Sequence, residues 1–136
     1  MFERDDPFTG TWRFDAQRSK LTTPFPRSWV QHIIATSDEV QVHENIVRPD
    51  GSETVVEVRA RFDSRDYPVS GSPAVDATAY TRVNSRSISG IGRKGGAIAL
   101  TETATVENNI LTLTYSIHSG DRVVATGVAV FEKKFD

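Results

Sequence analysis

Hydrophobic and polar residues alternate at every second position along most of this chain. In the segment 110–117, apolar side chains share one face and mainly hydroxyl side chains share the other. Residues 53–62 repeat the pattern, with Val, Ala and Phe on one face and Glu and Arg on the other. This alternation is typical of strands that are buried on one side. The same pattern, rich in β-branched and aromatic residues, predicts seven further strands: Thr11–Asp15, Trp29–Thr36, Glu39–Val47, Ala77–Asn84, Ser87–Gly92, Ala97–Val106 and Arg122–Lys133.

Turn-forming residues separate the predicted strands at short intervals. Pro49–Ser52, Glu107–Asn109 and Ser119–Asp121 are rich in the Gly, Asn, Asp and Pro that favour tight hairpins. The only helix that the pattern predicts is one or two turns at 16–21. Strands joined in sequence by tight turns form an antiparallel meander, and closing the meander into a barrel removes its exposed edges. We therefore expect one all-β domain over residues 1–136, an up-and-down antiparallel β-barrel of about eight to ten strands.

The composition excludes several classes of function. The chain has 16 Lys and Arg against 18 Asp and Glu, and its net charge of −2 gives no basic surface for nucleic acid. It has no Cys, which rules out disulfides and thiolate chemistry. No apolar run approaches the roughly 20 residues of a spanning helix, so we expect no membrane insertion. The acidic start, Met1–Pro7, is not a secretory leader; as written the chain is expected to be cytoplasmic, or exported if a native leader was removed.

Several motifs carry a family resemblance. Gly10-Thr11-Trp12 resembles the opening Gly-x-Trp of the lipocalins and fatty-acid-binding proteins, collectively the calycins, and residues 130–134 look like the last strand of the fatty-acid-binding proteins. Other stretches are similar to a group of small bacterial lipocalin-like proteins: Ser19-Lys20, Asp66–Pro73 and Lys94–Gly96. The resemblance spans nearly the whole chain. It implies a lipocalin-like barrel that binds a small apolar or amphipathic ligand, in a group that has no settled activity.

The resemblance also assigns structural roles and shows departures from the family. It implies that Trp12 plugs one end of the barrel under a cation from Arg13, Lys133 or Lys134. Fatty-acid-binding proteins insert a helical lid after the first strand, where this chain has only the short segment 16–28. They hold the ligand carboxylate with Arg and Tyr on the last strand. Here the corresponding residues are Ala129 and Phe131, so that anionic anchor is missing.

Alternation also predicts two carboxylates and one imidazole inside the barrel. Glu44 and Glu102 each lie on the apolar face of their strand, and His32 faces inward if Val30 and Ile34 do. A carboxylate on an apolar face is costly unless it is paired or functional. Either these groups form a network that fixes the barrel, or a shift of one residue turns them outward, or they bind a ligand.

Three polar or charged side chains and one aromatic side chain complete the predicted lining. Tyr115 lies on the apolar face of its strand. Tyr80 and Arg82 share a face, and either face of that strand can be the inner one. On the last strand the inward face is small except for Phe131, as though it made room for a ligand or a neighbouring side chain.

Two loops are candidates for the border of the barrel mouth. The long segment 62–76 contains Tyr67 between Asp66 and Pro68, and we expect this tyrosine to cover part of the cavity entrance. The alternative is that Tyr67 forms a short extra strand on the barrel wall. The second loop, 22–26, offers an aromatic side chain to the entrance.

The sequence leaves two functions of different classes. The first is a binding protein whose ligand contacts are His32, Glu44, Tyr67, Tyr80, Arg82, Glu102, Tyr115 and Phe131. The second is a small enzyme, such as an isomerase, cyclase or lyase, that uses a buried Glu as general acid or base. A filled barrel with a structural role is the third possibility. No motif indicates a metal site, a cofactor or a nucleophile, so we expect none.

Overall fold

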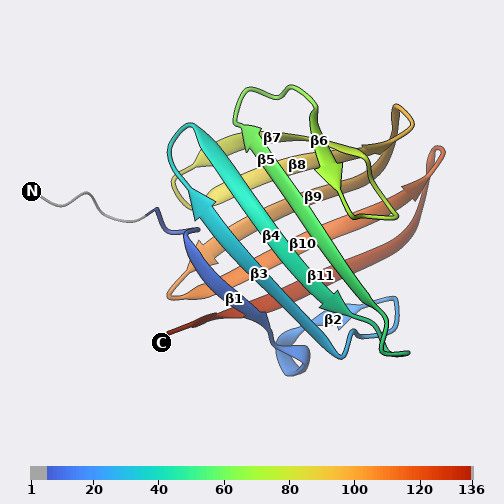
Figure 1. Ribbon diagram of the computed structural model, residues 1–136, viewed down its shortest axis with the longest axis horizontal. Helices are drawn as coiled ribbons and strands as arrows, with labels where there is room; N and C mark the ends of the chain where they lie inside the picture. The colour runs from blue at the N-terminus through green and yellow to red at the C-terminus, as the bar shows by residue number, and fades with distance from the viewer. Residues whose placement is uncertain (1–5, 136) are drawn as a thin grey trace, which may run out of the picture.

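The alternating segments form one antiparallel sheet that closes on itself, in a computed structural model that describes residues 6–135 (Figure 1). β1 pairs with both β3 and β11, so ten strands form a closed ring. The two-residue β2 lies outside this ring and pairs only with β11. The elements are β1 (Gly10–Phe14), the 3-10 turn η1 (Ala16–Arg18), β2 (Lys20–Leu21), β3 (Ser28–Ala35), β4 (Glu39–Val47), β5 (Glu53–Arg61), β6 (Tyr67–Ser70), β7 (Ala77–Asn84), β8 (Ser87–Lys94), β9 (Ala97–Glu107), β10 (Ile110–Ser119) and β11 (Arg122–Lys134). The predicted all-β barrel is confirmed.

The nine predicted strands are all present, and two strands were not predicted. β2 is only two residues long and follows η1, which is shorter than the predicted helix. β6 lies inside the expected loop 62–76 and pairs through only two residues on each side. The alternative of a short strand at Tyr67 is therefore correct. The acidic segment 1–5 lies outside the described residues, and no helix within 6–135 is long and apolar enough to cross a membrane.

The barrel is flattened into two layers. Figure 1 shows β3, β4 and β5 crossing in front of β9, β10 and β11 at a steep angle, as in orthogonally packed sheets. The hairpin turns between β3 and β4 and between β9 and β10 lie at one end of the barrel. The turns between β4 and β5 and between β10 and β11 lie at the opposite end. The two ends differ in how they are filled.

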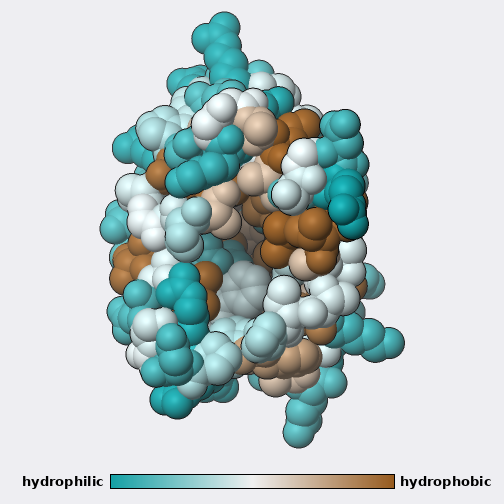
Figure 2. Space-filling model, turned by 90° about the vertical axis from the view of Figure 1, so that its right-hand side faces the viewer, coloured by the Kyte–Doolittle hydropathy of each residue, from teal (hydrophilic) through white to brown (hydrophobic). Residues whose placement is uncertain are grey.

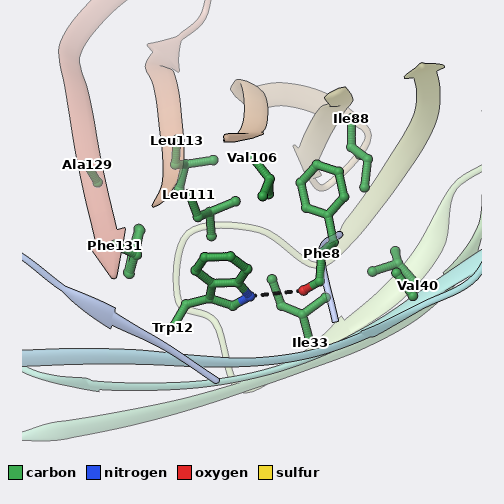
Figure 3. Packing of buried hydrophobic residues seen from close by; sticks show 11 residues of the cluster. Phe8, Trp12, Ile33, Val40, Ile88, Val106, Leu111, Leu113, Ala129 and Phe131 are labelled. Atoms are coloured by element: carbon green, nitrogen blue, oxygen red, sulfur yellow. Dashed lines mark hydrogen bonds between the residues drawn. The ribbon is translucent and has the colours of Figure 1, made fainter. Parts of the chain in front are cut away.

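Aromatic side chains fill the end that carries the N-terminal strand. Phe8 and Trp12 are fully buried, and the Trp12 Nε1–H donates a hydrogen bond to the Phe8 carbonyl at 2.9 Å (Figure 3). Around them pack Ile33, Val40, Ile88, Val106, Leu111 and Phe131. The Lys133 Nζ lies 5.7 Å from the centroid of the Trp12 ring. The predicted plug is therefore confirmed, and Lys133 supplies its cation.

Arg82 connects several chain segments at this closed end. Its guanidinium pairs with both carboxylate oxygens of Asp6, at 2.9 and 3.2 Å, and the two side chains are only 13% and 11% exposed. It also donates to the carbonyls of Thr36 and Ser85, in the two neighbouring turns. The charge lies 5.2 Å from the centroid of the Phe8 ring. Arg82 therefore joins the N-terminal segment to the β3–β4 and β7–β8 turns.

We predict that Arg82→Met lowers the free energy of unfolding by about 3 kcal/mol, because it leaves the Asp6 carboxylate without its partner. Urea unfolding monitored by tryptophan fluorescence measures the change. The control is Arg59→Met, because the Arg59 side chain is 70% exposed where it pairs with Glu39. That variant should stay within about 0.5 kcal/mol of the parent. Equal losses in both variants would contradict the role given to Arg82.

Candidate functional site

The rest of the barrel interior is hollow. An internal cavity of about 320 Å³ lies beyond the aromatic plug, between the β3–β5 layer and the β7–β10 layer. Its wall is mainly aliphatic. The polar residues in its lining are Gln31, Glu44, Ser72, Thr78, Tyr80, Glu102 and Tyr115. Within 6–135, no Lys, Arg or His contributes to this lining.

The cavity opens at the end opposite the plug. A second, more open hollow of about 450 Å³ shares Trp29, Ile46 and Tyr115 with the cavity wall, so the two spaces adjoin. Its outer wall comes from the segment 23–26, at the loop expected to border the mouth, and from 48–50 in the β4–β5 turn. Figure 2 faces this end of the barrel and shows a hollow bordered partly by hydrophobic side chains. A ligand therefore has a route from solvent to the interior.

One row of residues runs across five neighbouring strands inside the cavity. Strand register places Tyr80 on β7 opposite Gly90 on β8, and Gly90 opposite Glu102 on β9. Glu102 in turn pairs with Tyr115 on β10, which pairs with Gly127 on β11. Residues that are directly opposite in a sheet share a face. The two tyrosines therefore flank the Glu102 carboxyl along one wall.

The two glycines of this row make room for the tyrosine rings. A Cβ atom at Gly127 would overlap the ring and hydroxyl of Tyr115. A Cβ atom at Gly90 would lie 2.9 Å from Tyr80 Cε1 and 3.1 Å from Glu102 Oε1, so these two atoms are at most 6.0 Å apart. Each tyrosine ring therefore packs against the backbone of a glycine and does not project into the centre of the cavity. This arrangement keeps the centre of the barrel open.

Glu44 faces this row from the β4 side. Its carboxyl accepts a hydrogen bond from Trp29 Nε1 at 2.5 Å. The two residues are diagonal neighbours, because Trp29 pairs with Ile46 and Gln31 with Glu44. Burial in the apolar wall raises the pKa of Glu44 to about 6, and the Trp29 hydrogen bond opposes part of that rise.

Among residues 6–135, the Glu102 side chain forms no hydrogen bond or ion pair, and its oxygens are not fully buried. Its carboxyl is enclosed by the barrel, and the surface that stays accessible faces the cavity. Desolvation and, secondarily, the charge of Glu44 raise the pKa of Glu102 to about 7. Desolvation also raises the pKa of Tyr80 well above its usual value, with smaller contributions from the charges of Glu102 and Glu44. Burial therefore raises the pKa values of both Glu44 and Glu102 above the ordinary value of a Glu carboxyl, and that of Glu102 is the higher.

Four of the eight predicted contacts line the cavity together: Glu44, Tyr80, Glu102 and Tyr115. The predicted inward orientation of His32 is wrong. His32 is exposed, contacts Thr11 Oγ1 at 3.0 Å and lies beside His43 on the outer surface. Both faces of β3 carry apolar residues. The face that points into the barrel carries Trp29 and Gln31. Alternation within that strand alone could not distinguish the two faces.

The other three predicted contacts lie outside the cavity lining. Tyr67 does not cover the entrance, because it belongs to β6 and its hydroxyl donates to Asp63 at 2.7 Å. Arg82 turns to the carbonyls and carboxylate of the closed end, where its donors are satisfied. Phe131 is fully buried in an aromatic cluster, with its ring centroid 4.9 Å from that of Trp29. The prediction that these three residues line the ligand cavity is therefore wrong.

Sequence reasoning missed Trp29 and Gln31 as lining residues, although a signal for them exists. Ala35 pairs with Val40 across the β3–β4 turn, so Gln31 falls opposite Glu44. If Glu44 faces inward, a tight hairpin at 36–38 therefore turns Gln31 inward as well. It also missed Ser72 and Val75 as individual lining residues, although the segment 62–76 that contains them was a candidate for the border of the barrel mouth. Within the described part of the chain, no three acidic or imidazole side chains come together as a metal site would require.

Comparisons with known proteins support the fold. No protein-family model matches the chain, and no curated protein sequence does. The structure is similar to the crystal structure of the zebrafish ileal bile acid-binding protein in complex with cholic acid, with a TM-score of 0.59. The match covers 94% of this chain and 99% of that one, at 12% sequence identity. The fold is the calycin-type barrel. At this identity the likeness concerns the fold alone, and no ligand follows from it.

We predict that the buried acids make the protein less stable as the pH rises. Their pKa values in the folded protein exceed the 4.5 of an ordinary Glu, so the folded state binds more protons than the unfolded chain up to about pH 7. Glu102→Gln removes one such group. Its gain in unfolding free energy over the parent should be near zero at pH 4 and reach roughly 3 kcal/mol at pH 8.

Urea titrations at several pH values test this prediction. Glu107→Gln is the matched control, because Glu107 lies on the same strand and is exposed. It should follow the parent at every pH. A difference between Glu102→Gln and the parent that does not change from pH 4 to pH 8 would show that the Glu102 carboxyl is not desolvated.

Proposed function

We propose that this protein binds a small apolar or amphipathic molecule in the barrel cavity, as a lipocalin-like binding protein of the kind found among small bacterial proteins. One observation carries the proposal: a cavity of about 320 Å³ with a mainly aliphatic wall and a few convergent polar groups. Sites for small molecules have this size and composition. The adjoining hollow beside Trp29 and Tyr115 supplies the entrance.

The likeness to a solved binding protein supports the same proposal. The zebrafish protein holds cholic acid, a small amphipathic molecule. Both chains are matched over nearly their full length, so the fold of a protein that binds cholic acid has a counterpart here. The ligand of this chain is proposed from the chemistry of its own cavity.

The enzyme alternative rests on Glu102, whose carboxyl meets the requirement for a general acid or base near neutral pH. A binding role accounts for the same carboxyl, because polar groups in an apolar pocket orient a ligand. The likeness to a binding protein favours binding over catalysis. We therefore propose binding without turnover.

Filling the cavity tests the proposal. The probe is N-phenyl-1-naphthylamine, an uncharged apolar dye whose fluorescence rises in apolar surroundings. Ala104 lines the cavity and the adjacent Thr103 is exposed on the outer face of β9. We expect Ala104→Phe to weaken dye binding by about tenfold or more, because the ring occupies the space that the dye needs. Thr103→Phe should bind the dye like the parent.

A second cavity-filling variant distinguishes loss of the cavity from misfolding of a single variant. Val42 lines the opposite wall, so Val42→Phe should give the same loss of binding. Circular dichroism checks that each variant keeps the barrel, because an added ring in a packed wall costs about 1–3 kcal/mol. If the parent does not bind the dye, or if both cavity variants bind it unchanged, the cavity is not the binding site.

A further inference from the structure

We propose that the cavity selects amphiphiles with a cationic amine head and discriminates against anionic ones, an inference that rests on the proposed binding function. The polar group of such a ligand would lie between Glu44 and Glu102, beside Trp29, Tyr80 and Tyr115. The alkyl or ring portion would fill the aliphatic part of the cavity.

The charges of the lining give the first argument. The titratable groups that face the cavity are Glu44, Tyr80, Glu102 and Tyr115, all of them acids, and no basic side chain within 6–135 lines it. Arg82 is held by Asp6 at the closed end, and Arg48 lines the entrance hollow outside the cavity lining. An anionic head would therefore lose its hydration and meet only carboxyl groups. A cationic head would meet two opposite charges.

The unpaired state of Glu102 gives the second argument. Glu102 is only partly buried, and a carboxylate at an apolar wall is costly unless it is paired or functional. Glu44 has the Trp29 indole N–H, whereas Glu102 has no such donor in the described chain. Its accessible surface faces the cavity. A ligand that brings hydrogen-bond donors and a positive charge would satisfy this group.

The aromatic residues give the third argument. Trp29 lies beside Glu44, and Tyr80 and Tyr115 flank Glu102 in the strand register. Gly90 and Gly127 make room for the two tyrosine rings. Aromatic faces attract cations through their negative quadrupole, and sites that bind alkylammonium groups combine several of them. Carboxylates and aromatic rings thus act on the same head group.

Three ligands with one chain length separate the head-group classes: octylamine, octanol and octanoate. Each is titrated at pH 8 against the parent protein loaded with N-phenyl-1-naphthylamine. At this pH an alkylamine is cationic, because its pKa is near the value of about 10.4 that lysine has. We expect octylamine to bind at least about tenfold more tightly than octanol, and octanoate to bind more weakly than octanol. Lowering the pH to 5 protonates both carboxyls and should remove most of the preference for the amine.

Matched variants assign the preference to the carboxyls. Glu102→Gln should lower the preference for octylamine over octanol by about fivefold or more, with the octanol affinity of the same variant as the reference. Glu107→Gln, on the outer face of the same strand, should keep the full preference. An effect of Glu102→Gln on octanol as large as that on octylamine would contradict the proposal.

The outcomes distinguish this inference from the proposed function. If the dye binds but octylamine binds no more tightly than octanol, or if none of the three displaces it, the head-group inference is wrong and the binding function stands. If octanoate binds most tightly, the inference is also wrong. If the dye does not bind the parent at all, the proposed function itself fails.

Discussion

The pairing of β1 with β11 is the constraint on which the rest of this structure depends. It closes the sheet, so each of the ten strands in the ring has a neighbour on both sides and the interior is cut off from solvent along its sides. A closed barrel must then fill its interior or leave it hollow. Here the N-terminal segment fills one end with Phe8 and Trp12, and Arg82 holds that segment to the adjacent turns. The rest of the interior becomes the cavity.

Closure also determines the chemistry of Glu44 and Glu102. Each has an ordinary place in a strand, but the barrel wall around them removes most of their water. The proton-binding behaviour of the cavity therefore follows from topology and not from an unusual local motif. Gly90 and Gly127 complete the arrangement, because they let Tyr80 and Tyr115 lie along the wall. Five neighbouring strands of the closed sheet, β7 to β11, thus carry this polar row.

Much of this could be predicted from the sequence. The alternation of apolar and polar residues identified nine strands, and the same alternation placed Glu44, Glu102 and Tyr115 inside. The sequence leaves a gate and a short strand at Tyr67 both open, because β6 contains Pro68 and pairs through only two residues on each side. His32 was assigned to the wrong face, because apolar residues occupy both faces of β3. The positions of Arg82 and Phe131 depend on contacts with Asp6 and Trp29, which are distant in the sequence and have no local signal.

The central claim is that two carboxyl groups lie desolvated at the wall of the cavity, without a cationic partner among residues 6–135. Carbon-13 NMR of the Glu side-chain carboxyls, followed from pH 3 to 9 and assigned with the Gln variants, measures it most directly. The account predicts that two resonances titrate well above the others, with Glu44 near pH 6 and Glu102 near pH 7. Titration of both groups near pH 4.5, the ordinary value for Glu, would show that the carboxyls are hydrated or paired and would contradict the account.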